Sequence, residues 1–380
     1  MTPSSRPNAA QLSARIGELY RDAQACAAAA GLVYVTNESP GIRRQRSGRG
    51  FAYRDAKGRT ITDESLKERI RQLAIPPAWR EVWICPDDDG HIVAVGEDDR
   101  GRKQYLYHER WRTLRDLLNF YRLIGVGEHL TAVRAHVERQ LRRRAFDRDR
   151  VLAAMVRIMD LSAVRVGNEV YAEENDSLGL TTLTPRTATV DGDQVRLRFS
   201  AKSGKRADLL VRDRAVARVV DRLKARRSRR LFTVDGRAID SGEVNALLEV
   251  LSEGHITAKD FRTWQATHIV FVHLAEHLDV PTNEREQMVL AAIDTAAAAL
   301  GNTRAVARSH YVHPALVTAY LDGALHDLLP DRTPRQGRLL APSERRLLAV
   351  LANALEHEAG LASVPPGPAG RDAPVTAAPR

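Results

Sequence analysis

The sequence has few cysteines, few aromatic residues and no long apolar run. Only Cys26 and Cys85 are cysteines in 380 residues, which excludes a disulfide framework and a cysteine-based zinc site and fits a reducing compartment. No apolar run approaches the roughly 20 residues that cross a bilayer. The amino terminus lacks the apolar segment of a secretory signal. We therefore expect a cytoplasmic protein with no membrane contact.

Acidic residues are also fewer than basic residues. Lys and Arg total 58 against 48 Asp and Glu, a formal net charge of +10. Most of the basic residues are arginines, whose planar fork pairs with phosphate oxygens. A GC-biased genome accounts for some of this arginine but less readily for its clustering, so a nucleic acid or another polyanion is the favoured partner. No Gly-x-x-x-x-Gly-Lys-[Ser/Thr] loop occurs, so ATP is not implied.

The hydrophobic pattern predicts an α+β protein in four parts. Residues 1–30 form an extension, disordered over its first ten residues and helical over 12–30. Residues 31–108 form a small antiparallel β domain. Residues 109–360 form a mainly α-helical domain with a small β-sheet. Residues 361–380 are rich in Ala, Pro and Gly and are expected to be a disordered tail.

Turn and strand signals are dense in residues 31–108. The pattern predicts a strand over 32–35, a basic Gly-rich turn over 41–50, and a hairpin joining 51–53 to 60–61. A helix capped by Thr62 or Asp63 should run through Leu73, before two prolines. Near the end of this part, Tyr105 and Tyr107 lie among basic residues, with Arg102 and Lys103 before them and His108 after them. They suit contact with DNA phosphates and bases, or equally one face of an edge strand.

Two basic residues lie where the helical part turns. Arg165 follows a long apolar helix beside Gly167, where a cation at a helix end is the plain interpretation. Residues 179–211 alternate as a small antiparallel sheet, with a first strand expected over 180–183. Lys202 then falls at a hairpin tip, where a lysine is usually only solvated.

A later helix is predicted to begin at Ala258 with Thr257 as its cap, and it carries Lys259 and Arg262 on one side of its first turn. Cations there oppose the helix dipole, which makes sense if a phosphate binds at that end. The same helix carries His273 and His277 at a spacing that suits a metal. No third ligand is evident, so surface or core histidines are favoured and no metal site is predicted.

One tyrosine lies in a basic connection between a helix predicted to end at Gly301 and a helix that Pro314 opens. Tyr311 follows Ser309 and precedes Pro314, with Arg304 and Arg308 upstream. Taken alone, a half-buried aromatic that pins a short helix is the favoured interpretation. The alternative is a nucleophile. A phenol has a pKa of about 10 and attacks poorly unless cations surround it. A phosphate in a pocket of Arg and Lys would supply both the electrophile and the reason for the cations.

Arg165, Lys202, Lys259, Arg262 and Tyr311 can together act on one phosphodiester. The arginines would hold the non-bridging oxygens as the phosphorus becomes five-coordinate. The lysine of a mobile hairpin would protonate the leaving alkoxide. The tyrosine would attack in line and become a phosphotyrosine. No metal is needed, because arginine and lysine supply the positive charge.

The ordered motifs resemble type IB DNA topoisomerases, and most closely the short poxvirus-like bacterial branch. In the helical part they are Arg-Val-Gly-Asn (165–168), Ala-Lys-Ser-Gly-Lys (201–205), Lys-Asp-Phe-Arg-Thr-Trp (259–264) and Ser-x-Tyr (309–311). In the β part they are Ile-Pro-Pro-Ala-Trp (75–79), Val-Trp-Ile (82–84) and Gly-Arg-Lys-Gln-Tyr (101–105). The resemblance covers about residues 30–325.

The resemblance implies a clamp around duplex DNA and a role for each catalytic residue. Tyr311 would form a 3′-phosphotyrosyl link and free a 5′-hydroxyl, while Arg165 and Arg262 bind the scissile phosphate. Lys202 would be the general acid. Many relatives have histidine nine residues before the tyrosine, where this chain has Asn302. We expect that amide to donate a neutral hydrogen bond to a phosphate oxygen, with somewhat weaker stabilisation of the transition state.

The resemblance also implies the DNA contacts and the partners. Lys259 would be a supporting phosphate contact. A second group of DNA-binding residues is expected near the end of the β part: Arg102, Lys103, Gln104, Tyr105 and Tyr107. We expect a monomer that relaxes supercoiled double-stranded DNA without metal, nucleotide or another cofactor, in the cytoplasm and associated with the nucleoid.

Two other functions compete with this prediction. Tyrosine recombinases share the phosphotyrosine chemistry, but they usually carry His-x-x-Arg where this chain has Lys259 and Arg262. They also have a helical amino-terminal domain rather than a β-rich one. A non-catalytic basic DNA-binding protein would need only the charge.

Overall fold

The computed structural model describes residues 9–169, 172, 177–226, 228–335 and 337–357. They fall into two compact units, which we call the β-rich unit (residues 15–119) and the helical unit (residues 9–14 and 120–357). The disorder expected for residues 1–8 and 361–380 lies outside the described residues. Residues 9 and 10, also expected to be disordered, open helix α1 (Ala9–Arg21). The predicted division of the chain after residue 108 stays a prediction.

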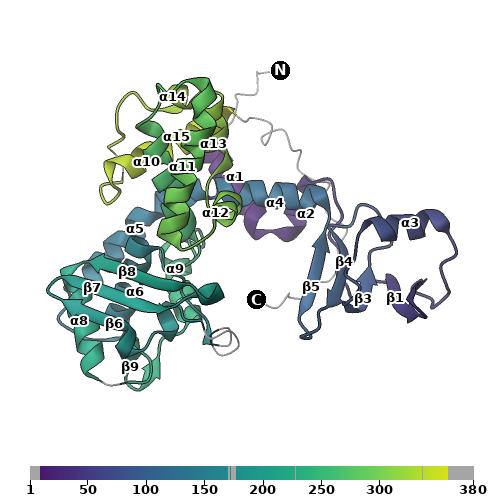
Figure 1. Ribbon diagram of the computed structural model, residues 1–380, viewed down its shortest axis with the longest axis horizontal. Coiled ribbons are helices and arrows are strands. Elements are labelled where there is room, and N and C mark those ends of the chain that lie inside the picture. Colours follow the sequence, from purple (N-terminus) through teal and green to yellow (C-terminus); the bar gives the residue numbers. More distant parts are fainter. Residues whose placement is uncertain (1–8, 170–171, 173–176, 227, 336, 358–380) are drawn as a thin grey trace. The chain divides into compact units, whose positions relative to one another are not determined.

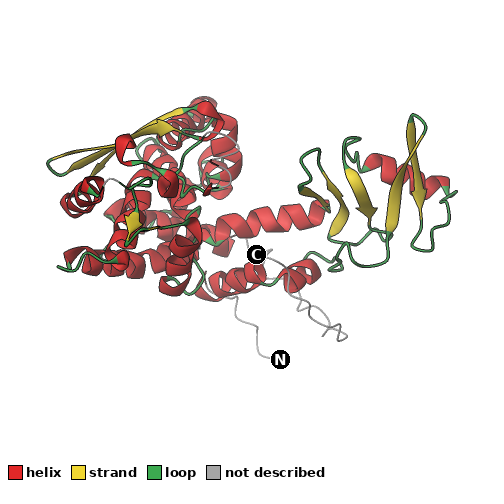
Figure 2. Ribbon diagram, turned by 90° about the horizontal axis from the view of Figure 1, so that it is seen from below, coloured by secondary structure: helices red, strands yellow, loops and turns green. Residues whose placement is uncertain are grey.

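The β-rich unit is built on an antiparallel sheet, drawn as yellow arrows on the right of Figure 2. The sheet has five strands in the order β2-β1-β3-β4-β5. Its strands are β1 (Ile42–Ser47), β2 (Gly50–Arg54), β3 (Arg80–Ile84), β4 (Ile92–Glu97) and β5 (Lys103–Tyr107). Its helices are the larger part of α1, α2 (Ala23–Ala29), α3 (Glu64–Gln72) and most of α4 (Glu109–Tyr121). Both faces of the sheet are covered, because Val82 and Ile84 belong to one buried cluster and Trp83 to another.

The helix predicted through Leu73 is present as α3, and Asp63 caps it by accepting the N–H groups of Ser65 and Leu66. The single helix predicted over 12–30 is instead two helices. Asp22 breaks it, because its carboxylate caps α2 by accepting two backbone N–H groups.

Two strand predictions for this unit were wrong. The stretch 41–50, predicted as a turn, is mostly strand β1, which pairs with β2. The hairpin predicted to join 51–53 to 60–61 is present in a short form, because Ile61 N–H donates to Tyr53 O at 2.9 Å and Arg54 bridges Thr60. The arginine-rich strand is tolerated because Arg44 donates to the carbonyls of Ile75, Pro76 and Trp79. The strand predicted over 32–35 is reduced to one bridge at Val33.

The helical unit contains most of the helices (Figure 1). They are α5 (Leu123–Arg142), α6 (Arg148–Ser162), α8 (Arg214–Ala225), α9 (Ser241–Leu251), α10 (Asp260–Ala275), α11 (Thr282–Leu300), α12 (Arg304–His310), α13 (Pro314–Leu321), α14 (Leu325–Leu328) and α15 (Pro342–His357). Helix α6 runs through the core, with Met155 and Ile158 fully buried. The α+β class predicted from the sequence is confirmed.

A small antiparallel sheet lies against α6 and α8 (Figure 1). Its strands are β6 (Ala188–Asp191), β7 (Gln194–Ser200) and β8 (Arg206–Arg212), in that order, and a two-stranded ribbon, β9 (Thr233–Val234) and β10 (Arg237–Ala238), lies elsewhere in the unit. The strand predicted over 180–183 is wrong, since Leu180–Thr182 is a 3-10 turn. The backbone N–H groups of Leu180 and Thr181 donate to the carbonyls of Arg165 and Val166 rather than to the sheet.

Helix α10 begins at Asp260, two residues after the predicted start at residue 258. The predicted cap at Thr257 is wrong, because the N-cap residue is Lys259, which makes no side-chain cap bond. Thr257 instead donates its N–H and its hydroxyl to the Asp260 carboxylate. Asp260 also pairs with the buried Arg122 at the start of α5. These contacts fix the end of the helix that carries Lys259 and Arg262.

Candidate active site

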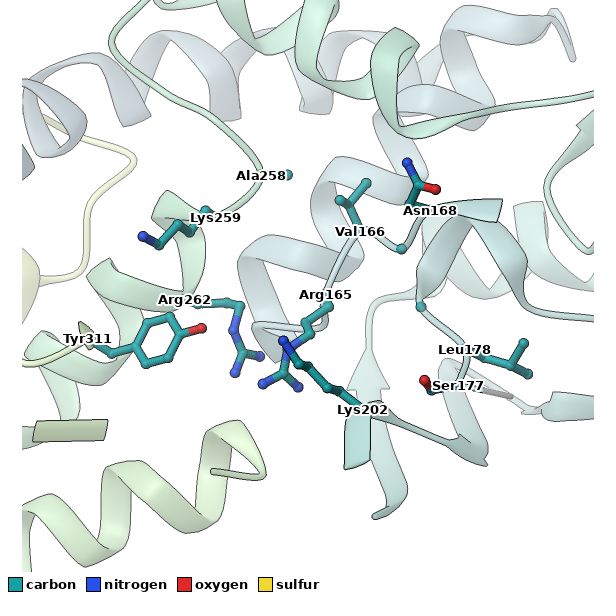
Figure 3. Close-up of a pocket in the computed structure, with 12 residues that line it drawn as sticks. Arg165, Val166, Asn168, Ser177, Leu178, Lys202, Ala258, Lys259, Arg262 and Tyr311 are labelled. Carbon is teal, nitrogen blue, oxygen red and sulfur yellow. The ribbon is translucent and has the colours of Figure 1, made fainter. Parts of the chain in front are cut away.

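A cavity of about 340 Å³ opens in the helical unit, with the phenol of Tyr311 at one wall (Figure 3). It gathers five residues that the sequence separates widely: Arg165, Lys202, Lys259, Arg262 and Tyr311. The remaining lining residues are Val166, Gly167, Asn168, Ser177, Leu178, Gly179 and Ala258.

Tyr311 follows the last residue of α12 and is half-buried. Its N–H donates to Ala307 O at 3.0 Å, which continues the helix by one bond. Its hydroxyl points toward the Arg262 guanidinium, whose Cζ lies 5.0 Å from the centre of the phenol ring (Figure 3). Gly301 ends α11 with a left-handed backbone (φ +65°), as the sequence predicts, and the chain then turns into α12.

Arg262 is only 4% exposed and is held by backbone carbonyls. Nη1 donates to Ala163 O at 2.5 Å and Nη2 to Leu300 O at 3.0 Å. Among the described residues, its buried Nε–H has no hydrogen-bond partner. A guanidinium fixed on two sides with a donor left over is preorganised to bind an anion.

Arg165 lies on an extended segment just after α6, which ends at Ala163 with a left-handed backbone (φ 50°). This segment packs closely against the turn at Gly179. A Cβ atom added to Gly179 would lie only 2.4 Å from the Cα of Gly167. Gly167 itself has φ +87°, a conformation that favours glycine. The two glycines therefore allow the close approach that fixes the segment carrying Arg165.

Asn302 contacts this arginine. Its Oδ1 accepts a hydrogen bond from Arg165 Nη2 at 2.8 Å, and its N–H donates to Ala297 O at 2.9 Å. Its Nδ2 is buried and has no partner in the described part of the chain. The amide thus orients Arg165 and keeps one donor for a ligand.

The two lysines are exposed at the cavity wall. Lys202 lies in a 3-10 turn (Lys202–Gly204) between β7 and β8, at the hairpin tip that the sequence predicts. Its amino group lies beside Arg165 in Figure 3. In the same loop, Lys205 Nζ donates to Gly301 O at 3.3 Å, so the hairpin reaches the turn that precedes α12. Lys259 lies at the start of α10.

The charges alter the pKa of the phenol. Burial raises the pKa of Tyr311, but the charge and hydrogen bonding of Arg262, followed by the charges of Arg165 and Lys259, outweigh it and lower the pKa below 10. Burial and the charge of Arg165 lower the pKa of the Arg262 guanidinium, while Tyr311 opposes them. Two guanidinium groups that repel each other across a cavity favour an anion between them.

The other predicted DNA-binding residues lie in the β-rich unit, on and just before the edge strand β5. Tyr105 and Tyr107 are 42% and 38% exposed and stack with ring centres 5.9 Å apart, on the same side of the strand. Gln104 Nε2 and Arg102 Nε donate to the Asp98 carboxylate at 3.0 and 2.9 Å. Lys103 is exposed at the start of the strand. The edge-strand interpretation of the two tyrosines is therefore confirmed, and their contact with DNA stays a prediction.

The paired histidines are engaged with protein groups. His273 Nε2 contacts Met288 Sδ at 3.2 Å, and His277 Nδ1 contacts His273 O at 2.7 Å. No group of three or more His, Cys, Asp or Glu residues suited to a metal occurs within the described ranges. None of the helices described for this chain is long and apolar enough to cross a membrane.

Sequence reasoning assigned no role to Asn168 and Ser177, which line the cavity. Asn168 stood in the Arg-Val-Gly-Asn motif, so its place next to Arg165 was an available signal. Ser177 lies outside every motif and offered no such signal.

Comparison with known proteins identifies the family. Residues 108–322 match the family described as eukaryotic DNA topoisomerase I, catalytic core, and residues 50–98 match the N-terminal domain of bacterial DNA topoisomerase IB. DNA topoisomerase 1B of Acanthamoeba polyphaga mimivirus is 28% identical over 285 residues, which are 72% of this chain and 85% of the relative. DNA topoisomerase 1B of Vaccinia virus (strain Copenhagen) is 19% identical over 257 residues, 64% of this chain and 76% of the relative.

The catalytic-core match covers more than half of the chain. The chain therefore belongs to the type IB DNA topoisomerase family, and the resemblance seen in the sequence motifs is confirmed.

Proposed function

We propose that the helical unit cleaves and rejoins one strand of duplex DNA through Tyr311. The observation that carries the proposal is the single cavity that gathers Tyr311, Arg165, Arg262, Lys202 and Lys259 from positions 165 to 311. Four cations around one phenol can stabilise the negative charge that develops on the non-bridging oxygens of a phosphodiester during attack.

In the proposed reaction the Tyr311 phenol loses its proton to solvent, and the phenolate oxygen attacks the phosphorus in line. The P–O bond to the tyrosine forms as the P–O5′ bond breaks, which leaves a 3′-phosphotyrosyl link and a free 5′-hydroxyl. Arg165 and Arg262 bind the non-bridging oxygens, and Lys259 adds a further phosphate contact. Lys202 gives its proton to the departing O5′.

Religation is the same path in reverse. The 5′-hydroxyl attacks phosphorus, neutral Lys202 takes its proton, and Tyr311 leaves as a phenolate. One ester replaces another in each direction, so neither step needs ATP. The free strand end can rotate before religation, which relaxes supercoils.

Asn302 completes the proposed phosphate site. Its Oδ1 already accepts from Arg165, so its buried Nδ2 is the group left to donate to a phosphate oxygen. This bond is neutral and contributes less to a charged transition state than a protonated histidine would.

The β-rich unit is proposed to bind the duplex through Arg102, Lys103, Gln104, Tyr105 and Tyr107. Exposed tyrosines beside basic residues suit contact with bases and phosphates. The protein is further proposed to act as a monomer on double-stranded DNA, in the cytoplasm and associated with the nucleoid, without metal or nucleotide.

The test is relaxation of a supercoiled plasmid in EDTA without ATP, followed by detection of covalent protein–DNA adduct. The wild type should relax the plasmid and form adduct, whereas Tyr311→Phe should bind DNA but form none. Tyr320→Phe is the matched control, since it removes a tyrosine hydroxyl that donates to His277 O and does not line the cavity. A wild type without adduct would favour the non-catalytic DNA-binding protein.

Relaxation of a plasmid with no special site, by a single copy of the chain, would also separate this activity from that of a tyrosine recombinase. A recombinase requires partner sites and several protomers, whereas the proposed reaction requires neither.

A further inference from the structure

A buried hydroxyl links the tyrosine segment to the helix that carries the phosphate-binding arginine. Thr267 lies on α10 and is 0% exposed. Its Oγ1 donates to Tyr311 O at 3.0 Å and accepts from His313 N–H at 3.2 Å. The hydroxyl therefore bonds to the chain on both sides of Val312 and leaves neither Tyr311 O nor His313 N–H unpaired.

This is not the usual bond of a threonine inside a helix. A threonine in the middle of a helix commonly donates to the carbonyl four residues earlier. A hydroxyl has one proton, and here it goes to Tyr311 instead. Arg262 and Thr267 are five residues apart on one helix, a rise of about 7.5 Å. Helix α10 thus holds the tyrosine at its carbonyl and faces its ring with the Arg262 guanidinium.

Little else fixes α12, the short helix that precedes the tyrosine. Of its seven residues only Ala307 is buried. Its Arg304 pairs with Asp294, but both side chains are about half exposed, at 50% and 48%, and such pairs contribute little. After the tyrosine, Val312 and His313 are buried. The position of Tyr311 therefore depends on the contacts that follow α12 rather than on α12 itself.

His313 supports the same turn. It is 0% exposed, and its Nδ1 accepts from Ala315 N–H at 3.2 Å as the N-cap of α13. Burial lowers the pKa of His313 to about 3, so the ring is neutral at working pH and Nδ1 stays an acceptor. The chain from Tyr311 to Ala315 is thus held by the hydroxyl of Thr267 on α10 and by the imidazole of His313.

We propose that Thr267 is a positioning residue for strand cleavage, whose hydroxyl sets the distance between the Tyr311 phenol and Arg262. This inference rests on the proposed function. Without the hydroxyl, the Tyr311 carbonyl and the His313 N–H are left unpaired in a buried place, and the turn shifts until they find other partners. A displacement on the order of 1 Å at a reacting group can reduce a rate about 100-fold.

The experiment uses the full-length protein and a suicide DNA substrate, with enzyme in excess. Thr267→Val keeps the shape and removes the hydroxyl, and Thr267→Ser keeps the hydroxyl. Thr267→Val should cleave about 10- to 100-fold more slowly at saturation, with its Kd for DNA unchanged. Thr267→Ser should cleave at nearly the wild-type rate. Thr267→Cys keeps a weak donor and should fall between them, which preserves the test if the valine variant does not fold.

Two readouts distinguish the positioning of Tyr311 by Thr267 from a general effect of Thr267 on folding. In the DNA-free protein, Tyr311 of Thr267→Val should titrate closer to the ordinary phenol pKa, because the ring lies farther from Arg262. Ser252→Ala is the matched control. Ser252 is also 0% exposed, and its hydroxyl likewise donates to one backbone carbonyl and accepts one backbone N–H, outside the cavity. It should lower thermal stability and leave the cleavage rate unchanged.

The outcomes separate the two proposals. Adduct formation by the wild type, together with a Thr267→Val rate within twofold of it, overturns the inference and leaves the proposed function standing. A serine variant as slow as the valine variant also overturns the inference. Absence of adduct from the wild type overturns the proposed function itself.

Discussion

The buried carboxylate of Glu344 should contribute strongly to the stability of the helical unit. Glu344 is 6% exposed and lies on α15, beyond the segment that matches the catalytic core. Its two oxygens accept from Arg134 Nη1 and Nη2 at 2.7 and 2.8 Å, from Trp264 Nε1 at 2.8 Å and from Ala341 N–H at 2.7 Å. Arg134 also pairs with Asp160 at 2.8 Å.

The pKa shift of Glu344 and the cost of breaking a buried ion pair correspond to the same loss of stability. Burial raises the pKa of Glu344, but the hydrogen bonds and charge of Arg134, with the Trp264 and Ala341 donors, lower it from 4.5 to about 2. A gap of that size corresponds to about 3 kcal/mol at 1.36 kcal/mol per pH unit. Removal of one partner from a buried ion pair costs about 3–5 kcal/mol. Since Arg134 keeps Asp160, the lower end applies.

The perturbation is Glu344→Gln. An amide accepts through one oxygen only, and its NH2 group would face Arg134 and a second donor. The free energy of unfolding at pH 7, measured by urea titration with circular dichroism at 222 nm, should fall by about 3 kcal/mol. The folded-state pKa is depressed, so this contribution is full above about pH 4.5 and fades as the pH falls toward 2. The difference between wild type and variant should therefore shrink in acid.

The control is Glu286→Gln, an exposed position on α11 of the same unit, which should change stability by less than about 0.5 kcal/mol. A Glu344→Gln effect below about 1 kcal/mol, or one that is the same at pH 7 and pH 3.5, would refute the reasoning. The result also bears on activity, because Trp264 is two residues from Arg262 on α10. Loss of the network should slow strand cleavage as well.

Three further predictions concern the proposed reaction. The difference in absorbance at 295 nm between wild type and Tyr311→Phe, titrated without DNA, reports the ionisation of the Tyr311 phenol. Its midpoint should lie below about pH 10, because nearby cations favour the phenolate, and Arg165→Ala should raise that midpoint. A midpoint at or above about pH 10 would contradict the assigned environment. Asn302→Ala should slow single-turnover cleavage by up to about 10-fold, the size of one neutral hydrogen bond, whereas Asn302→His should cleave at least as fast as the parent; unchanged rates in the alanine variant would remove Asn302 from the site. Lys103→Ala should weaken DNA binding uniformly across sequences and lower the slope of log Kd against log salt by about 1, and an unchanged slope would argue against a phosphate contact.

Much of the fold and of the site was predictable because the signals are local. Helix periodicity with caps at Asp63, Gly301 and Pro314 placed helix ends near their observed positions. The five cavity residues followed from chemistry, because a phenol near cations makes sense only around a phosphate. Their roles in the reaction remain predictions.

The features that were missed depend on contacts between distant segments. Arg44 makes a strand possible only because carbonyls 31 to 35 residues away accept its protons. The turn at residues 180–182 replaces a strand because Gly167 meets Gly179. Thr267 and Tyr311 are 44 residues apart, so no spacing rule links them.

The bonds that hold Arg262 have a consequence for mutagenesis. Its guanidinium joins the carbonyl ends of α6 and α11, at Ala163 and Leu300, while the same group is proposed to bind the phosphate. Replacing Arg262 with alanine would therefore unpair two buried carbonyls in addition to removing a charge. The rate lost in such a variant sums an architectural defect and a chemical one, and would overstate what the arginine contributes to the transition state.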